Sequence, residues 1–148
     1  MQGAPSDSST PGPGLTVVMA SPSKDDHHTL RRICRHWKWR AYQAHTCREA
    51  LSLVRQRRIP VVICERNLPD GDWTSVLGGL KELPHRPQLI VSSRLADHRL
   101  WADVLDLGGY DLLISPFDAG EVSRVVFMAW HSMQHERGRS LASPAAAG

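Results

Sequence analysis

Five short segments of strand length alternate with longer segments in which apolar residues recur at helical spacing. This alternation constrains the fold more than any other feature of the sequence. The strand-length segments are 15–20, 41–45, 61–64, 88–93 and 111–115. Between and after them, apolar residues recur three and four positions apart, as on one face of an amphipathic helix. The set after the first segment is Leu30, Ile33, Cys34 and Trp37, and the last set is Val122, Val125, Val126, Ala129, Trp130 and Met133.

Strands that alternate strictly with helices form a parallel sheet that is covered by helices on both faces. Segment 61–64 is apolar throughout, as expected for a strand buried on both faces. Because crossovers between parallel strands are right-handed, five such strands favour the flavodoxin-like order 2-1-3-4-5. The sequence therefore predicts an α/β fold of the (βα)5 type, a doubly wound parallel sheet in three α/β/α layers.

The composition changes near both ends of the chain. Residues 1–14 are mostly Pro, Gly, Ser and Thr, and residues 138–148 are similarly poor in large apolar side chains. We expect both to be disordered tails, because they have little to bury. Residues 15–137 carry the alternating pattern and form the one predicted domain. Hydrophobic residues make up 41% of the chain and charged residues 22%, which is typical of a globular protein.

Charge and cysteine content narrow the classes of protein further. The net charge is +3, and the basic residues are scattered rather than gathered in a stripe, so we expect no nucleic-acid partner. Cys34, Cys47 and Cys64 have no CxxC spacing and lie among apolar neighbours, which indicates buried, reduced thiols. No segment approaches the ~20 apolar residues of a membrane span, and the start lacks signal-peptide features. We expect a cytoplasmic protein without membrane contact.

In a doubly wound sheet, functional residues lie at the carboxyl ends of the strands. The segments predicted there are 20–23, 65–70, 92–94 and 115–117. They carry no nucleotide-binding, zinc-protease or serine-hydrolase motif. His27 and His28 point about 100° apart on a helix and make a weak metal pair. Trp73 follows a Pro-Asp-Gly turn on the side of the predicted site, where an exposed aromatic side chain would matter most for binding.

Three motifs at these strand ends resemble the receiver domain of bacterial response regulators. They are ICERNLPDGDW (63–73), IVSSR (90–94) and LGGYDLLISPFDAGEV (107–122), and the resemblance covers residues 15–135. It implies a cis peptide bond before Pro116. It also implies a site in which two acidic residues and an Asp hold Mg²⁺, the Asp accepts a phosphoryl group, and a Ser or Thr and a Lys bind its oxygens.

Most positions of that site have changed in this chain. The acidic pair falls on Ser21 and Pro22, the acceptor on Glu65, the hydroxyl on Ser92, the Lys on Ser115, which precedes Pro116, and the aromatic switch position on Leu112. Neither residue at the acidic pair offers a carboxylate, and Ser115 supplies no cation. The resemblance thus implies a degenerate site. We expect Mg²⁺ binding to be lost, no cofactor to be held, and conventional phosphorylation to fail.

Asp25 and Asp26 could replace the missing acids only by reaching back to the strand end. Four helical residues rise ~6 Å, whereas ligands of Mg²⁺ lie within ~2.1 Å of the ion. We expect both residues to begin the first helix instead, where their charge complements the helix dipole.

Glu65 has two interpretations. Its carboxylate could imitate the phosphorylated state by accepting a hydrogen bond from Ser92, with Arg66 or Arg94 balancing the charge. Alternatively, it is a solvated residue at a strand end with no role of its own. The sequence leaves both open.

The resemblance implies a stand-alone receiver-like signalling module of a two-component or phosphorelay pathway. We expect it not to be an enzyme and to act by protein–protein interaction, independently of phosphorylation. The implied partner is a histidine kinase or another signalling protein, or a second copy bound through the last two helices and the fifth strand. The candidate residues of that face are Arg99, Trp101, Asp103, Arg124 and Trp130.

Two other functions stay open. One is an active phosphorelay receiver with a non-standard acceptor, which Mg²⁺-dependent labelling by a small phosphodonor would support. The other is an FMN- or nucleotide-binding protein built on the flavodoxin-like fold. A yellow purified protein, or a large thermal shift with FMN, would reveal the second.

Overall fold

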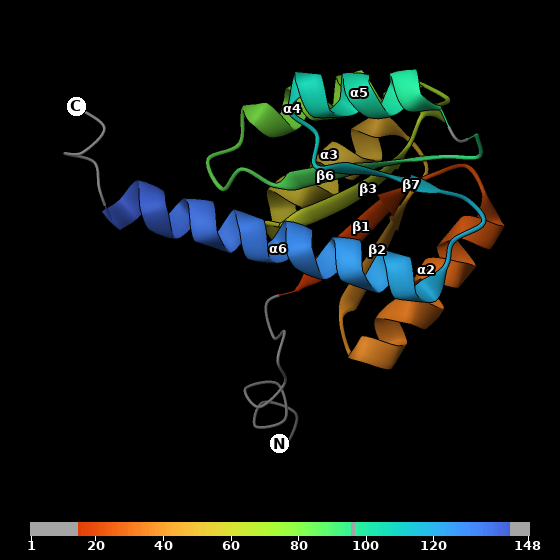
Figure 1. Ribbon diagram of the computed structural model, residues 1–148, viewed down its shortest axis with the longest axis horizontal. Coiled ribbons are helices and arrows are strands. Elements are labelled where there is room, and N and C mark those ends of the chain that lie inside the picture. Colours follow the sequence, from red (N-terminus) through yellow and green to blue (C-terminus); the bar gives the residue numbers. More distant parts are fainter. Residues whose placement is uncertain (1–14, 96, 143–148) are drawn as a thin grey trace.

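The computed structural model describes residues 15–95 and 97–142 (Figure 1). Its strands are β1 (Thr16–Ala20), β2 (Arg40–Ala44), β3 (Val61–Glu65), β4 (Asn67–Leu68), β5 (Gly71–Asp72), β6 (Gln88–Ser93) and β7 (Asp111–Ile114). Its helices are α2 (Lys24–Trp37), α3 (Cys47–Arg57), α4 (Trp73–Lys81), α5 (His98–Leu107) and α6 (Ala119–Ala142). The predicted alternation of strands and helices is confirmed. Segments 1–14 and 143–148 lie outside the described residues.

The main sheet has five parallel strands in the order β2-β1-β3-β6-β7. In chain order of the five main strands this is 2-1-3-4-5, so the predicted flavodoxin-like topology is confirmed. The register places Ala20 beside Cys64, and Glu65 beside Ser92. The carboxyl ends of the central strands therefore meet at one edge of the sheet, where the sequence predicts the site.

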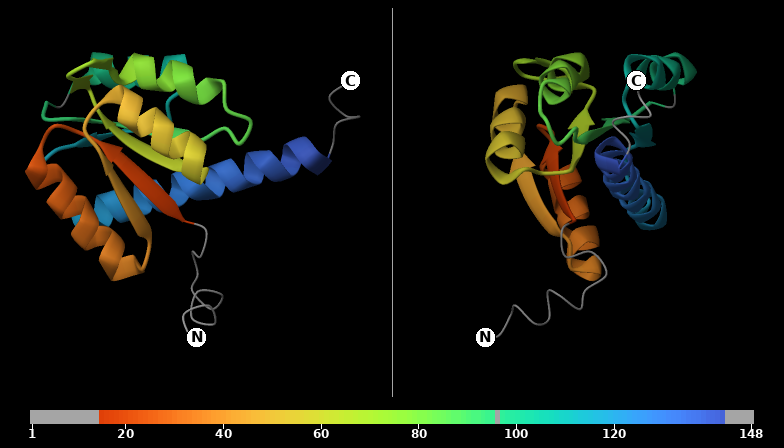
Figure 2. Two further views of the ribbon diagram at one scale, coloured as in Figure 1. Left: turned by 180° about the vertical axis from the view of Figure 1, so that it is seen from behind. Right: turned by 90° about the vertical axis from the view of Figure 1, so that its left-hand side faces the viewer.

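Two apolar layers bury the two faces of the sheet. On one face, α3, α4 and α5 pack against residues such as Val18, Val62 and Val91. On the other face, α2 and α6 pack against the alternate residues of the same strands, such as Val17 and Ile63. Figure 2 shows α3 and α6 on opposite sides of the strands. Alternation of side chains along a strand explains how one apolar segment supplies both layers.

The helix ends follow the local chemistry of the sequence. Thr46 caps α3 as its side chain accepts a hydrogen bond from the Glu49 N–H at 3.1 Å. Gly108 ends α5 in the left-handed conformation, with φ of 109°, which glycine adopts without a steric penalty. Within the described residues, no helix is both long and apolar enough to cross a bilayer.

The structure has three features that the sequence did not predict. A two-stranded antiparallel ribbon of β4 and β5 follows β3. Trp73, whose exposure the sequence left open, is buried in the core under α3, α4 and α5. Helix α6 continues to Ala142, past the predicted domain boundary at residue 137, and extends beyond the sheet (Figure 1). Trp73 is buried because it opens α4, whose apolar stripe faces the sheet.

Candidate functional site

The carboxyl edge of the sheet gathers the polar residues that the sequence singled out. Ser21 follows β1, Glu65 ends β3, Ser92 lies near the end of β6, and Ser115 follows β7. The three serines are buried, and Glu65 is partly exposed. Pro22 is exposed. The edge therefore combines buried hydroxyl groups with one carboxylate that solvent can reach.

Asp26 joins this edge, contrary to the expectation that it serves only the start of a helix. Both Asp25 and Asp26 do lie in the first turn of α2, as predicted. Asp25 is exposed, whereas Asp26 is only 5% exposed. The Ser115 hydroxyl donates to Asp26 Oδ1 at 3.0 Å, and the Ser21 hydroxyl donates to Oδ2 at 3.3 Å. Ser21 and Ser115 occupy the positions at which a receiver domain has an acid and a lysine. In this chain both of them donate hydrogen bonds to one aspartate instead.

The start of α2 explains why Asp26 points inward. Ser23 is the N-cap, and its hydroxyl accepts a hydrogen bond from the Asp26 N–H at 3.2 Å. The Ser21 hydroxyl in turn accepts from the Ser23 N–H at 3.0 Å. The chain therefore turns tightly after β1. The sequence prediction estimated the distance from Asp26 to the strand end from the rise of a helix. Because the chain turns back after β1, that rise does not give the actual distance.

Glu65 lies in a field that favours its neutral form. Burial and the nearby charge of Asp26 raise the pKa of the Glu65 carboxyl, and Arg94 partly opposes them. Arg66, the other cation considered as a counter-charge, forms an ion pair with Asp97, with Nη1 and Oδ2 3.7 Å apart. Of the two predicted counter-charges, Arg94 is the one that acts on Glu65.

The Ser92 hydroxyl is fully buried and has no hydrogen-bond partner in the described part of the structure. The hydrogen bond from Ser92 to Glu65 that the sequence suggested is therefore not formed. The Ser115–Pro116 peptide bond is cis, as the resemblance implied. Leu112, at the switch position, is partly buried and packs against the layer under α3, α4 and α5.

His27 contacts the end of β1, which the sequence did not predict. It is 4% exposed, and its Nε2 lies 2.8 Å from the Ser21 carbonyl oxygen, while Nδ1 forms no hydrogen bond with the described residues. Burial lowers the pKa of its imidazole. His28 is exposed, so the two histidines point apart as predicted. His27 precedes Leu30 by three positions, and that spacing was the signal for its burial.

The donor set at this edge differs from a usual magnesium site. Both oxygens of Asp26 already accept hydroxyl protons, and Glu65 is the other carboxylate nearby. Mg²⁺ is normally bound through oxygen ligands in octahedral geometry, with several waters retained. In the described ranges 15–95 and 97–142, no group of three or more His, Cys, Asp or Glu side chains is placed to hold a metal ion.

The residues of the predicted interaction face lie on helices α5 and α6. Arg99, Trp101 and Asp103 are exposed on α5, and Trp101 Nε1 donates to Asp111 Oδ1 at 3.4 Å. Arg124 is exposed on α6 but lines a groove shared with α2. Trp130 is half-buried and packs against the core under α2 and α6. The five residues therefore come from two helices, and Trp130 is more buried than the other four.

We compared the chain with proteins of known family, function or structure. No protein-family model matches the chain. Over 102 residues, 66% of this chain, it is 28% identical to the KDP operon transcriptional regulatory protein KdpE of Escherichia coli K12, of which it covers 45%. The chain spans less than half the length of the curated relatives it matches.

Solved receiver structures superpose closely despite low identity. A two-component response regulator from Clostridium difficile has a TM-score of 0.71 at 19% identity, with 80% of this chain and 98% of that chain covered. The signal receiver domain of an HD domain-containing protein from Pseudomonas fluorescens Pf-5 has a TM-score of 0.73 at 20% identity, with 82% and 98% covered. The chain therefore has the fold of the receiver domains of two-component response regulators.

Proposed function

We propose that the chain is a receiver-like signalling module of a two-component or phosphorelay pathway that acts by protein–protein contact and is not phosphorylated. It performs no catalysis of its own and holds no Mg²⁺. The proposal rests on the receiver fold together with one observation, the burial of Asp26 between the hydroxyls of Ser21 and Ser115.

Phosphorylation of a carboxylate requires cations, because two anions must approach each other. In this site a phosphoryl group near Glu65 would also meet the carboxylate of Asp26. Ser21 and Ser115 place hydroxyl groups where a receiver domain has an acid and a lysine. Arg94, the cation that acts on Glu65, is exposed to solvent. Loss of two electrostatic contributions of ~3 kcal/mol each would slow the reaction by about 10⁴.

The same arrangement disfavours the FMN alternative. A flavodoxin-like phosphate site uses the N–H groups at the start of the helix after β1 to bind an anion. In this chain the Asp26 N–H donates to the Ser23 hydroxyl, and the Asp26 carboxylate lies beside that turn. A phosphate there would compete with a cap and meet a like charge.

We also propose that the domain adopts a single conformation. Coupling in a receiver needs a hydroxyl that follows the phosphoryl group and an aromatic switch residue. Ser92 makes no hydrogen bond to Glu65, and Leu112 packs against a helix layer. We therefore expect Glu65 not to act as a phosphate mimic, and we expect binding to read the packed surface rather than a switched state.

The partner that fits best is a histidine kinase or another protein of the same pathway, docked on the exposed side of α5. Trp101 is 46% exposed there, between the charged residues Arg99 and Asp103. Exposed tryptophan and arginine are the side chains most enriched in binding hot spots. Pull-down with the wild-type chain and with Trp101→Ala tests this surface, and equal recovery of partners would remove it from the proposal.

The test of the main proposal is intact mass after incubation with acetyl phosphate and Mg²⁺. We expect no gain of a phosphoryl group by the wild-type chain. Glu65→Gln and Ser92→Ala are measured alongside, because an adduct that Glu65→Gln abolishes would establish an active receiver with a glutamate acceptor. An adduct that survives Glu65→Gln would move the acceptor elsewhere and would equally overturn the proposal.

A further inference from the structure

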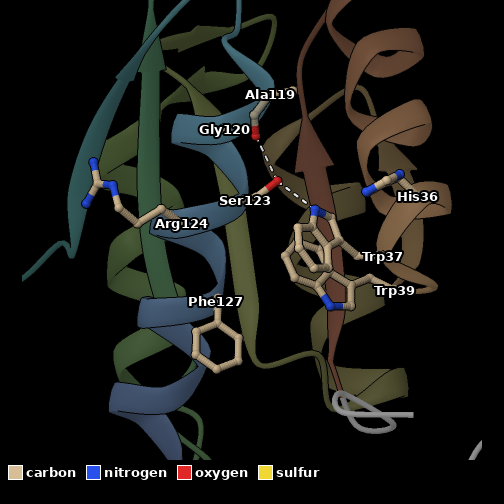
Figure 3. Close-up of a pocket in the computed structure, with 8 residues that line it drawn as sticks. All are labelled: His36, Trp37, Trp39, Ala119, Gly120, Ser123, Arg124 and Phe127. Atoms are coloured by element: carbon tan, nitrogen blue, oxygen red, sulfur yellow. Dashed lines mark hydrogen bonds between the residues drawn. The ribbon is translucent and has the colours of Figure 1, made fainter.

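Helix α2 is held to the rest of the molecule differently at its two ends. Near its C-terminal end a groove lies between α2 and α6. Across this groove, Trp37 Nε1 donates to the Ser123 hydroxyl of α6 at 2.8 Å (Figure 3). The first turn of α2 instead contacts the residues that follow β1 and β7 through buried polar groups. The contacts of the first turn therefore depend on the protonation state of its side chains.

His27 is the buried basic side chain of this first turn. It is 4% exposed, and its Nε2 lies 2.8 Å from the Ser21 carbonyl oxygen. Because a carbonyl oxygen only accepts hydrogen bonds, Nε2 carries the proton of the neutral ring and Nδ1 is bare. Nδ1 is also buried and forms no hydrogen bond with the described residues. These contacts suit the neutral imidazole.

A second proton on His27 would go to Nδ1. It would place a positive charge and a new N–H donor at a buried position, which is costly unless both are paired. The Ala44 carbonyl oxygen lies near the ring, but it already accepts a hydrogen bond from the Ser21 N–H at 3.0 Å. In agreement, burial is the main cause that lowers the pKa of His27.

The charged groups that face His27 come from its own helix and from the segment after β2. Asp26 favours the charged ring, but both of its carboxylate oxygens already accept hydroxyl protons. His45 follows β2, and its ring centroid lies 5.2 Å from that of His27. Glu49 of α3 lies 3.5 Å from Nδ1 of His45, and β1 leads into the uncharged Ser21 carbonyl. A proton on His45 therefore adds a like charge beside His27.

We propose that His27 is a pH-sensitive latch of the carboxyl edge of the sheet. The neutral ring holds the first turn of α2 against the end of β1. Protonation of His27 in mild acid releases this turn, and with it Asp26 from the hydroxyls of Ser21 and Ser115. This inference is independent of the proposed function, because it does not depend on whether Glu65 accepts a phosphoryl group.

The rest of α2 limits how far the opening spreads. Leu30, Ile33 and Cys34 are buried in the layer shared with α6. The hydrogen bond between Trp37 and Ser123 joins an indole to a hydroxyl, neither of which titrates in mild acid. Acid should therefore expose the first turn while the second half of the helix stays folded. Amide hydrogen exchange detects local opening of this kind.

The test is amide hydrogen exchange of the full chain at pH 7.5 and pH 5.5, corrected for the intrinsic effect of pH on exchange. In the opened turn His27 has its ordinary pKa of 6.5. Lowering the pH therefore favours the opened turn by up to about tenfold. Protection of segment 21–28 should fall by that factor, and protection of segment 30–37 should not change. Unchanged protection of segment 21–28 would overturn the proposal.

Two glutamine variants assign the effect to one histidine. His27→Gln keeps an N–H that can donate to the Ser21 carbonyl oxygen, but it does not take up a proton. It should abolish the loss of protection in acid. His28→Gln is the matched control, because His28 is exposed on the adjoining turn, and it should lose protection as the wild type does. A loss that persists in His27→Gln, or that His28→Gln abolishes, would contradict the latch.

Titration of the wild-type chain keeps the proposal testable if His27→Gln does not fold. NMR of the isotope-labelled chain follows each histidine ring and each backbone amide between pH 5 and pH 8. We expect His27 to titrate below its ordinary 6.5, and the amide signals of the first turn of α2 to change with it. A His27 ring that titrates at or above 6.5, or amide signals that stay constant across its titration, would overturn the proposal.

Discussion

Asp26 and its two serine donors decide the chemistry of this edge at the scale of single residues. A carboxylate that is 5% exposed is costly to bury unless hydrogen bonds compensate it. The hydroxyls of Ser21 and Ser115 provide that compensation. Removing the acid leaves two buried hydroxyls without acceptors, whereas removing an exposed acid leaves nothing unpaired.

Asp26→Ala should therefore lower the free energy of unfolding by about 2–3 kcal/mol, because each orphaned hydroxyl loses its acceptor. Relief of the repulsion with Glu65 offsets part of this loss. Urea denaturation at neutral pH measures the change. Asp25→Ala is the matched control on the same turn, and its loss should stay below about 1 kcal/mol. Equal losses for the two variants would contradict the role of the serine hydrogen bonds.

Glu65 should make the stability of the fold depend on pH in an unusual direction. The pKa of Glu65 is raised above its ordinary 4.5 in the folded state. The folded chain therefore binds this proton more tightly than the unfolded chain, and the contribution of Glu65 to stability falls as pH rises from about 4.5 through the raised pKa.

Glu65→Gln should thus raise the free energy of unfolding at pH 7, by less than about 1 kcal/mol since the side chain is partly solvated. The gain should disappear below the ordinary carboxyl pKa, where both states are protonated. Thermal or urea unfolding of both proteins at pH 4 and pH 7 measures it. A variant that is less stable than the wild type at pH 7 would show that Glu65 is instead held as an anion.

At the scale of elements, the turn between β4 and β5 is tied to the start of α3. The Asp70 carboxylate accepts hydrogen bonds from the Cys47 N–H at 2.7 Å and the Arg48 N–H at 3.1 Å. These are N–H groups of the first turn of α3, which have no partner within the helix. The hydrogen bond from Cys47 is the main cause that lowers the pKa of the Asp70 carboxyl.

Asp70→Ala should destabilise the chain at pH 7 by removing this cap of α3. Because the folded pKa of Asp70 lies below its ordinary 3.8, the stabilisation is present above that value and is lost as pH falls through the folded pKa. The difference between variant and wild type should therefore shrink in acid. Unfolding midpoints from pH 2 to pH 7 give the measurement, and a difference independent of pH would exclude the charged hydrogen bonds as its cause.

Two adjacent glycines of α4 make a further test of how helices pack. A methyl group added at Gly78 meets no atom within 4 Å, whereas at Gly79 it would lie 2.7 Å from the methyl carbons of Leu51 on α3. Gly78→Ala should therefore stabilise the chain by about 0.5–1 kcal/mol through helix propensity. Gly79→Ala should gain less, because Leu51 must shift. Urea midpoints compare the two, and an equal gain would mean that Leu51 moves freely.

At the scale of the whole molecule, the cysteines report on the two apolar layers. Cys64 lies in the layer under α3, α4 and α5, and Cys34 lies in the layer under α2 and α6. Burial raises the pKa of Cys34 to about 12 and that of Cys47 to about 11. Burial also raises the pKa of Cys64. The thiolate forms that react with thiol reagents are therefore scarce in the folded chain.

Thiol labelling under native conditions should accordingly be slow at pH 8, and Cys34 and Cys64 should react at the same rate. The two layers share one sheet, so neither layer opens without the other. Mass spectrometry of digested samples over time gives the separate rates. Earlier labelling of Cys34 alone would mean that α2 and α6 detach as a unit of their own.

The order of the strands and helices, and the edge of the sheet at which the candidate residues lie, followed from the sequence. These features are local: side-chain periodicity sets the element, and Thr46 or Gly108 sets its end. The resemblance also located Ser21, Glu65, Ser92 and Ser115, because positions at strand ends are fixed once the strands are assigned.

The direction of a side chain across a turn depended on tertiary structure. Asp26 was predicted to serve a helix dipole, yet the tight turn through Ser23 buries it under Ser115, a contact between residues 89 positions apart. The groove is of the same kind, since Trp37 and Ser123 are 86 positions apart and meet only when α2 and α6 pack on one face. Periodicity determines which elements form, whereas the contacts between distant elements decide which polar groups are paired and which surfaces remain open.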